Sequence, residues 1–296
     1  MSADHIHKTY KLYLGGGFPR SESGRSLKIE KASRSASRPP QILAQIARAS
    51  RKDLRQAVEA AQGALGPWAR ARPMLRGQIL HRMAEMLDAR GQEFEDLLVG
   101  FGLSDRRQAR LEVEVSCDRL LWYAGWSDKL GQVLGAVNPV SGPFFDFSQP
   151  EAMGVVAVYP TERPALLSLV STLAPVLVGG NSSVFLIPYE AGPVAITFAE
   201  ILATSDVPGG VCNFLTGTRD ELLTHFAMHR GFSANFLVSD DPREQKLVSY
   251  EAADHVKRGK MVPQGTPALW RSNACQGLDW ISPFLEIKTT WHPIGL

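Results

Sequence analysis

Three cysteines are the side chains of this sequence best suited to nucleophilic chemistry. Cys117, Cys212 and Cys275 are odd in number and show no metal-type spacing, which favours reduced thiols over disulfides or a structural metal. A cysteine attacks a carbonyl carbon as its thiolate, which requires an accessible and activated sulfur. Cys117 and Cys212 fall on faces that we expect to be buried. Cys275 is the remaining candidate nucleophile, but we expect it to be an ordinary small apolar residue, which is how a free cysteine usually behaves.

His225 and His229 have a spacing that can bind a metal. They stand four residues apart on a predicted helix and so share a face. No third ligand and no His-Glu-x-x-His pattern accompanies them, and we expect no metal site. The sequence also contains no Gly-x-Ser-x-Gly elbow, no Walker-type phosphate loop and no Gly-x-Gly-x-x-Gly fingerprint. The commonest nucleophile and nucleotide motifs are thus excluded.

The composition is that of a folded globular protein. The 296 residues are 44% hydrophobic and 21% charged, which excludes a disordered chain, a collagen and a coiled coil, and predicts about two structural units. No window approaches the ~18 consecutive apolar residues of a transmembrane helix, and the polar start, Met1–Lys11, lacks the apolar core of a signal peptide. With reduced cysteines, these features favour a cytoplasmic protein without a membrane partner.

Basic residues concentrate in the first part of the chain, although the formal net charge is only +2. Residues 1–110 contain 20 Lys and Arg against 11 Asp and Glu, and the remainder contains 12 against 19. The basic residues are scattered along amphipathic helices, without interleaved aromatic residues or a nucleic-acid-binding motif. We therefore expect no nucleic acid partner. The asymmetry indicates solvated helix faces, or a surface that complements a partner protein.

Apolar strands alternate with helices in the second half of the sequence. Strands that are apolar along their whole length, with helices between them, are typical of a doubly wound parallel α/β sheet with helices on both faces. Such a sheet binds ligands at the carboxyl ends of its strands. The expected strands are 154–159, 183–187, 211–215, 234–238 and 260–262, and the helices 165–178, 193–203, 220–228 and 243–257.

Helices also dominate the part of the chain before this sheet. Ser50 is a good N-cap, and Asp53 three residues later completes an acidic variant of the capping box. The helix that they begin is expected to stop at Gly66-Pro67. Further expected elements are a strand over 11–18 that ends at a Gly15-Gly16-Gly17 turn, a loop with short strands over 21–40, and helices over about 79–98 and 109–130.

Two extended segments lie outside this alternation. Residues 132–140 and 144–147, separated by a Ser-Gly-Pro turn, predict a β-ribbon. In the tail, Leu285, Ile287, Thr289 and Trp291 alternate with other residues, which predicts a half-buried strand with these four side chains on one face. No strand lies beside the tail in sequence to pair with it, so we expect it to pair with a strand of another chain.

Four separated motifs, in the right order, resemble those of the aldehyde dehydrogenase superfamily. They are Ala57–Ala61 followed by Pro67-Trp68, Tyr123–Leu130 (YAGWSDKL), Leu173–Asn181 (LAPVLVGGN) and Val207–Gly217 (VPGGVCNFLTG). The resemblance covers about residues 11–262, and the tail is similar to the family's C-terminal strand. It implies a discontinuous Rossmann-like nucleotide-binding domain formed by residues 1–131 and 151–270. It also implies an oligomerisation ribbon with its C-terminal strand, formed by residues 132–150 and 283–296.

The distance between two elements sets this sequence apart from complete members of the family. Only ~20 residues separate the last expected sheet strand from the tail strand, too few for the family's catalytic domain, so we expect that domain to be missing. The pattern is most similar to the truncated second module of the family 16 aldehyde dehydrogenases. Because the family assembles through its ribbon and C-terminal strand, the resemblance implies oligomer contacts by Phe145, Phe147, Leu285, Ile287 and Trp291.

Positions that carry the family's chemistry are altered in this sequence. Aldehyde oxidation in the family needs a thiolate, an oxyanion donor and a carboxylate base. In the loop Pro160–Pro164, Glu162 stands where the family has its oxyanion asparagine, and an ionised carboxylate cannot donate that hydrogen bond. The base would fall near Pro263-Gln264-Gly265, which contains no acid, and the nucleophile belongs to the missing domain. We therefore expect no catalytic residues.

The resemblance also implies a vestigial nucleotide site. The family's ribose-binding Lys-Pro-x-Glu segment is Ile187–Glu190 here, so the glutamate remains and the lysine is replaced. The phosphate-binding Phe-Thr-Gly-Ser-Thr turn is Phe236–Asp240, with Val238 in place of the glycine and acids at the helix start. Vestigial contacts are expected from Pro160, Glu162, Ile187, Glu190, Gly217 and Ser239. We expect no cofactor, with NAD(P) binding weak at best.

These features predict a non-catalytic, aldehyde-dehydrogenase-like protein that acts by association. Its expected partner is a second copy, in a homodimer or higher oligomer, or a full-length aldehyde dehydrogenase. Two alternatives stay open. One is an active NAD(P)-dependent oxidoreductase acting on aldehydes, with Glu162 and Glu190 as its acids and Cys275 as its thiol. The other is a nucleotide or metabolite sensor that binds at the strand ends without chemistry.

Overall fold

A five-stranded parallel sheet forms the centre of the molecule. The computed structural model describes residues 7–31 and 40–295. The sheet has the spatial order β10-β9-β6-β7-β8 and consists of β6 (Val155–Tyr159), β7 (Ser182–Pro188), β8 (Cys212–Gly217), β9 (Ala234–Val238) and β10 (Arg258–Val262). The predicted doubly wound parallel sheet is confirmed. Its central strands are apolar along their length because both of their faces are buried.

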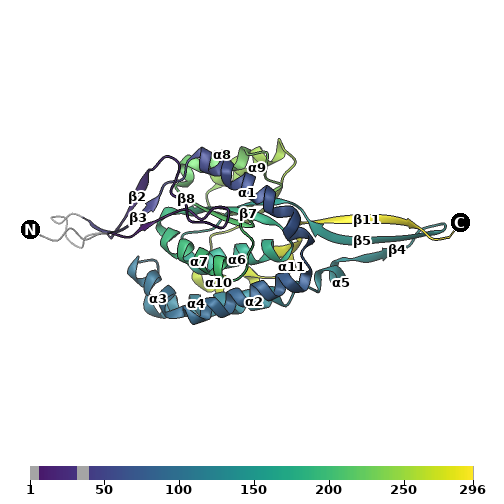
Figure 1. The fold of residues 1–296 in the computed structure, drawn as a ribbon, viewed down its shortest axis with the longest axis horizontal. Helices are drawn as coiled ribbons and strands as arrows, with labels where there is room; N and C mark the ends of the chain where they lie inside the picture. Colours follow the sequence, from purple (N-terminus) through teal and green to yellow (C-terminus); the bar gives the residue numbers. More distant parts are fainter. Residues whose placement is uncertain (1–6, 32–39, 296) are drawn as a thin grey trace, which may run out of the picture.

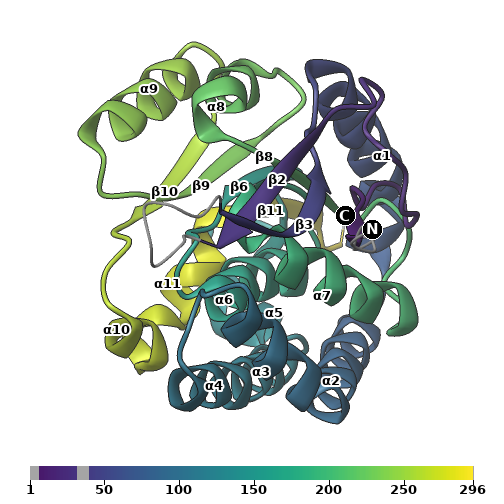
Figure 2. The ribbon, with the colours of Figure 1, turned by 90° about the vertical axis from the view of Figure 1, so that its left-hand side faces the viewer.

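Helices cover both faces of this sheet (Figures 1 and 2). One face carries α1 (Arg51–Arg70), α8 (Arg219–Met228) and α9 (Pro242–Ala253), and the other carries α6 (Ala165–Val178) and α7 (Gly192–Thr204). The residues of β6 alternate accordingly. Val155, Ala157 and Tyr159 pack in the apolar cluster that includes α1 and α8, whereas Val156 and Val158 pack in the cluster that includes α6 and α7.

A further layer of helices lies outside α6 and α7 (Figure 2). It consists of α2 (Pro73–Ala89), α3 (Gly91–Gly100) and α4 (Arg106–Ala124). Met83 and Leu87 of α2 and Leu120 of α4 are fully buried and belong to the same apolar cluster as α6. The larger of the two clusters therefore extends through two layers of helices on this side of the sheet.

Helix α1 begins as predicted but ends later. The Ser50 hydroxyl accepts a hydrogen bond from the Asp53 N–H, and the Asp53 carboxylate accepts one of 2.7 Å from the Ser50 N–H, which completes the capping box. The predicted stop at Gly66-Pro67 is wrong, because the helix continues to Arg70. Proline removes one helical hydrogen bond, but Trp68 directly after it is fully buried, and this burial stabilises the last turn.

The N-terminal segment forms a separate small sheet. Its strands, in the order β1-β3-β2, are β1 (Thr9–Tyr10), β2 (Ser26–Lys31) and β3 (Gln41–Ala47). The strand predicted over residues 11–18 is wrong, since the backbone there makes isolated bridges such as Tyr13 to Phe214. Gly15 and Gly16 take positive φ angles and turn the chain, which interrupts a continuous strand.

Part of the N-terminal region lies outside the described residues. The short strands predicted within residues 21–40 are confirmed by β2, but residues 32–39 of that range are not described. Residues 1–6, which belong to the start in which no signal peptide is expected, are not described either, so that expectation stays a prediction. Among the residues that are described, no helix is both long and apolar enough to cross a membrane.

A three-stranded antiparallel ribbon extends away from the body (Figure 1). Its strands, in the order β11-β5-β4, are β4 (Ala136–Asn138), β5 (Phe144–Ala152) and β11 (Leu285–Pro293). The inference that the tail strand must find its partner in another chain is wrong, because β11 pairs with β5 over nine residues. The start of the segment 132–140, predicted as extended, is instead part of the short helix α5 (Leu130–Leu134).

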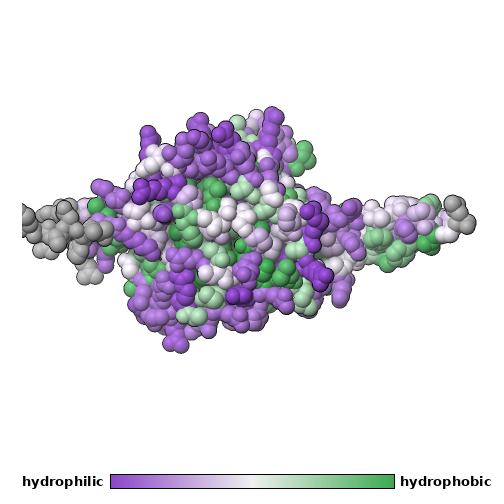
Figure 3. Space-filling view, viewed as in Figure 1, coloured by the Kyte–Doolittle hydropathy of each residue, from purple (hydrophilic) through white to green (hydrophobic). Residues whose placement is uncertain are grey.

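The predicted oligomerisation residues lie on both faces of this ribbon. In the observed register Phe145 and Phe147 share one face, where their rings lie 5.4 Å apart, and Ile287 and Trp291 share the other. Ile287 is 54% and Trp291 is 58% exposed, so the predicted half-burial of the tail strand is wrong. Leu285, at the base of the ribbon, is buried. Figure 3 shows hydrophobic side chains along the lower side of the ribbon.

A short segment between β10 and the ribbon covers the apolar core on the side of α4 and α6. It consists of α10 (Pro267–Arg271), the 3₁₀ turn η2 (Asn273–Cys275), α11 (Leu278–Ile281) and the 3₁₀ turn η3 (Ser282–Phe284). Trp270, Trp280 and Phe284 are each at most 3% exposed and belong to the same cluster as α6. The chain thus supplies its own cover here, from large apolar side chains.

A buried carboxyl group holds the start of α6. Glu112 of α4 is 5% exposed, and its Oε1 accepts hydrogen bonds from the N–H groups of Leu166 (2.7 Å) and Leu167 (3.2 Å). The first N–H groups of a helix have no partner within the helix, and Pro164 at the N-cap offers no side-chain acceptor. Burial raises the pKa of Glu112 to about 7, although the two backbone hydrogen bonds lower it.

We expect this carboxyl group to make the stability depend on pH. Its pKa is 4.5 when unperturbed and about 7 in the folded protein, so between these values the unfolded chain loses the proton that the native state keeps. The free energy of unfolding therefore falls as pH rises through this range, by up to about 3 kcal/mol. Urea unfolding of the wild type and of Glu112→Gln at pH 4.5 and pH 8 measures the change. A difference between the two proteins that is the same at both pH values would contradict this assignment.

Candidate functional site

The carboxyl ends of β6 and β9 mark the place where this sheet should bind a ligand. The chain leaves β6 toward β7 on one side and leaves β9 toward β10 on the other, so the crevice between them is the topological switch point of the sheet. A cavity of about 300 Å³ opens at the strand ends beside it. Its lining includes Thr161, Glu162, Glu190, Gly217, Arg219 and Gln264.

The side chain of Arg219 occupies the switch point itself. Its Nη2 donates hydrogen bonds to the carbonyl oxygens of Tyr159 (3.1 Å) and Pro160 (2.9 Å) after β6, and of Val238 (2.9 Å) at the end of β9. Its Nη1 forms an ion pair of 2.7 Å with Glu244, whose carboxylate also accepts 2.6 Å from the Ser239 hydroxyl. The guanidinium thus joins two strand ends to the first turn of α9.

Protein groups also satisfy the start of α9. Asp241 is the N-cap, and its carboxylate accepts from the Arg243 N–H at 2.8 Å. The hydrogen bond from the Arg243 side chain, together with this backbone bond, lowers the pKa of Asp241. Asp240 accepts from the Gln264 N–H at 3.2 Å. A helix N-terminus attracts anions, but here the Asp241 carboxylate already caps it, and Asp240 adds a second acid one residue earlier.

Apart from Arg219, the charged residues that line the cavity are all acidic. Glu162, Glu190 and Asp220 all border it. Burial raises the pKa of Glu190, and a hydrogen bond to the Glu190 carboxylate raises the pKa of Tyr189 to about 12. Carboxylates at this edge repel a negatively charged ligand, and the guanidinium of Arg219, already paired with Glu244, offsets that only in part.

The structure brings together most, but not all, of the residues predicted for a vestigial nucleotide site. Glu162, Glu190 and Gly217 line the cavity. Pro160 and Ser239 lie beside it as hydrogen-bond partners of the Arg219–Glu244 pair. Ile187 does not reach the cavity, because its side chain is 1% exposed and packs among the residues of α6 and α7.

Sequence reasoning missed Arg219 and Glu244, which dominate the geometry of the switch point. Arg219 is the first residue of α8, directly after the loop that ends β8. One feature of the sequence could have revealed Arg219, because it is a long cationic side chain directly after a strand of a doubly wound sheet. The carboxyl ends of such strands all meet at one edge. Nothing in the local sequence indicates that its side chain reaches across to β6 and β9.

The cysteines and histidines do not form a reactive group in the structure. All three cysteines are buried, and burial raises the pKa of Cys117 and Cys212 to about 12 and also raises that of Cys275. The Nδ1 of His229 is engaged with the Gly231 N–H at 3.1 Å. Within residues 7–31 and 40–295, no group of three or more His, Cys, Asp and Glu side chains is placed to hold a metal.

Comparison with known proteins identifies the family of this chain. The family model described as "Aldehyde dehydrogenase family" matches residues 26–265. The chain belongs to the aldehyde dehydrogenase family. This confirms the superfamily that the four sequence motifs indicated.

Solved structures with the same fold come from several bacteria. The NAD⁺ complex of an aldehyde dehydrogenase from Bacillus cereus has 19% identity and a TM-score of 0.77, over 86% of this chain and 51% of that one. HpcC from Thermus thermophilus has 24% identity and a TM-score of 0.77, over 86% and 48%. PnpE from Pseudomonas sp. WBC-3 has 21% identity and a TM-score of 0.79, over 86% and 50%. The chain spans about half the length of each of these structures.

The residues at the switch point do not fit the phosphates of NAD(P), the cofactor that the family implies. A pyrophosphate needs free N–H donors at a helix start and room for close backbone approach. In this chain the carboxylate of Asp241 caps the N-terminus of α9, Asp240 precedes it, and the guanidinium of Arg219 lies at the switch point, bonded to protein oxygens. Glu190 still borders the cavity, where a carboxylate can accept from a ribose hydroxyl.

Proposed function

We propose that this member of the aldehyde dehydrogenase family acts by association and not by aldehyde chemistry. The observation that carries the proposal is the ribbon, which projects from the body with apolar side chains exposed on both faces (Figures 1 and 3). Val137, Phe145, Ile287 and Trp291 are between 42% and 68% exposed. Contiguous exposed apolar residues mark interaction surfaces, and both outer strands of the ribbon have an unpaired edge within the described residues.

The altered chemistry of the switch point supports the same proposal. The family reaction needs an accessible thiolate, an oxyanion donor and a base. The three cysteines are buried and their pKa values are raised. Glu162 stands at the position that resembles the oxyanion donor, and the segment 263–265 contains no acid. None of the three requirements is met by the residues that the resemblance assigns to them.

A second copy of this chain is the proposed partner. The ribbon exposes apolar side chains beside free strand edges, so two copies could bury the same surface against each other. A closed twofold dimer, in which identical surfaces meet, is the commonest assembly of identical subunits. A full-length aldehyde dehydrogenase is the alternative partner, because its own ribbon would offer the same type of edge.

Sedimentation of the intact protein tests the association. We expect a dimer or larger species at micromolar concentration, since an obligate interface of roughly 2,000 Å² or more leaves no stable monomer. A monomer at about 10 μM that stays monomeric in the presence of a purified complete aldehyde dehydrogenase would overturn the proposal. A monomer that joins the complete enzyme would support the second partner instead of the first.

We also expect weak binding of NAD(P) and no turnover. Two or three unfavourable positions at about 1–3 kcal/mol each move a micromolar dissociation constant toward the millimolar range. Calorimetry with NAD⁺ and NADP⁺ measures the affinity, and the formation of reduced cofactor with a panel of aldehydes measures turnover. Cys275→Ala is the control, because a rate that this variant abolishes would identify a working thiol. That result, or a dissociation constant below about 10 μM, would contradict the proposal.

A further inference from the structure

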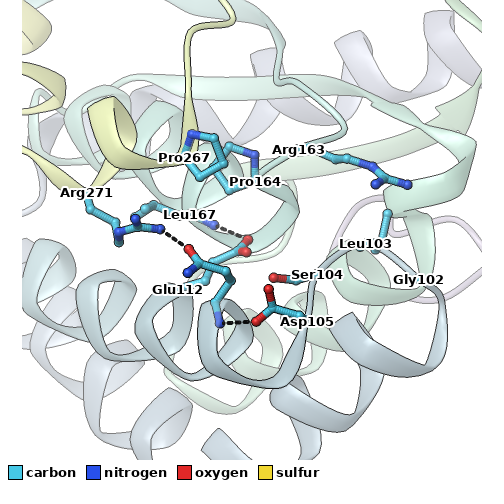
Figure 4. A pocket seen from close by; sticks show the side chains of 11 residues that line it. Gly102, Leu103, Ser104, Asp105, Glu112, Arg163, Pro164, Leu167, Pro267 and Arg271 are labelled. Atoms are coloured by element: carbon cyan, nitrogen blue, oxygen red, sulfur yellow. Dashed lines mark hydrogen bonds between the residues drawn. The ribbon is translucent and has the colours of Figure 1, made fainter.

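A second cavity lies beside the loop that leads from β6 into α6, where Arg163 lines it and the preceding Glu162 lines the cavity at the switch point. It has a volume of about 500 Å³ and is formed between the start of α4, the start of α6 and the short helix α10. Its lining contains charged side chains of both signs, which are Asp105, Glu112, Arg163 and Arg271. Figure 4 shows Arg271 and Arg163 at opposite ends of the cavity, with the Glu112 carboxyl group between them.

Glu112 presents one oxygen to this cavity. Its Oε1 accepts the two N–H groups at the start of α6, whereas Oε2 accepts no hydrogen bond from the described residues. The side chain is only 5% exposed, yet this oxygen is not among the buried side-chain atoms that lack a partner, so it keeps its contact with the cavity that Glu112 lines. A hydrogen-bond donor of a ligand in the cavity can therefore reach it.

Two arginines provide the opposite charge. The Nη1 of Arg271 donates a hydrogen bond of 2.6 Å to the side-chain oxygen Oε1 of Gln108, which is uncharged. The other N–H groups of this guanidinium are not bonded to any described residue. Arg163 is exposed and contacts the neighbouring Glu162 through Nε at 3.3 Å. Arg271 forms no salt bridge with a described residue, and the ion pair of Arg163 with Glu162 uses only its Nε, so both guanidinium groups keep N–H donors for an anionic group.

We propose that this cavity binds a small zwitterion that carries an ammonium group and a carboxylate, such as a free amino acid. The ammonium group lies against the free oxygen of Glu112, and the carboxylate lies against Arg271, with Arg163 at the far end for a longer molecule. The Asp105 carboxylate, which caps α4 by accepting from the Gln108 N–H, adds attraction for the ammonium end. A ligand with a single charge can satisfy only one half of the site.

Calorimetric titration with matched compounds tests the proposal. The probes are 5-aminovalerate, with glycine as a shorter zwitterion, and pentylamine and pentanoate as its two separate halves. We expect one zwitterion to bind at least tenfold more tightly than either half, since each charge-assisted hydrogen bond adds discrimination. Because the burial of Glu112 raises its pKa to about 7, contact with an ammonium group at pH 6 should also release a proton, which titration in two buffers detects.

Variants distinguish this site from general salt effects. Glu112→Gln is expected to weaken zwitterion binding at least tenfold and to abolish proton release, and Arg271→Gln, on a partly exposed helix, to weaken binding by a similar factor. Arg107→Gln removes the same charge from the exposed first turn of α4, outside the cavity, and should bind as the wild type does. Equal affinity for zwitterion and halves, binding unchanged in Arg271→Gln, or no binding of any probe would each overturn the proposal. The Arg271 variant decides the matter if Glu112→Gln does not fold.

Discussion

Replacing Ile287 by aspartate is expected to convert the assembled protein into monomers of 32.4 kDa. Ile287 is 54% exposed on β11, on the same ribbon face as Trp291. If this face is covered by a partner, the substitution places an ionised carboxylate in an apolar interface, where desolvation costs several kcal/mol. A loss of about 2.7 kcal/mol already raises a dissociation constant a hundredfold, which is enough to shift a micromolar sample from dimer to monomer.

A matched set of variants identifies the interacting face. Phe145→Asp makes the same kind of change on the opposite face, which Phe145 shares with Phe147. Tyr250→Asp is the control, because Tyr250 is 67% exposed on α9, away from the ribbon. We expect sedimentation to show a loss of assembly in one or both ribbon variants and none in the control. The melting temperature of the monomers should not change.

Deletion of the strand adds a stronger test of the same prediction. Removing residues 285–296 exposes the edge of β5 that β11 now covers, so we expect monomers or aggregation through this edge. If both aspartate variants and the wild type sediment as the same species, the ribbon is not the interface. The proposed mode of action would then lose its main support.

The sheet could be predicted from the sequence because its pattern is local. Strands such as Val155–Tyr159 are apolar at every position, which follows from burial on both faces of a parallel sheet. The N-cap of α1 was equally local, since the Ser50 and Asp53 side chains bond within four residues. The end of α1 was not, because the burial of Trp68 beneath other elements outweighs the effect of Pro67 on the helix.

Long-range contacts account for the errors. Ser148 and Thr289 share a hydrogen bond of 2.8 Å across 141 residues of sequence, and no local pattern in β11 specifies β5 as its partner. The same limit applies to the switch point. The sequence indicated which family positions carry unusual residues, such as Val238, but it could not show that Arg219 reaches two strand ends and Glu244 at once.

Replacing Arg219 by methionine is expected to lower the free energy of unfolding by about 3 kcal/mol. The change removes the donor shared by the carbonyl groups of Tyr159, Pro160 and Val238, and leaves the carboxylate of Glu244, which is 19% exposed, without its cation. Unsatisfied polar groups cost about 1–3 kcal/mol each when buried. For a protein of this size 1 kcal/mol corresponds to roughly 2–4 °C in melting temperature, so we expect a decrease of roughly 6–12 °C.

Two further variants test whether the loss of stability is specific to the Arg219–Glu244 ion pair. Arg230→Met removes an exposed arginine just beyond α8 and is expected to melt as the wild type does. Glu244→Gln keeps an acceptor for the Ser239 hydroxyl and loses the charge that faces Arg219. The two substitutions should therefore be non-additive by about 1 kcal/mol or more in a double-mutant cycle. An Arg219→Met protein that melts within about 2 °C of the wild type would show that the guanidinium does not hold the strand ends together, and the crevice would then be open to a ligand.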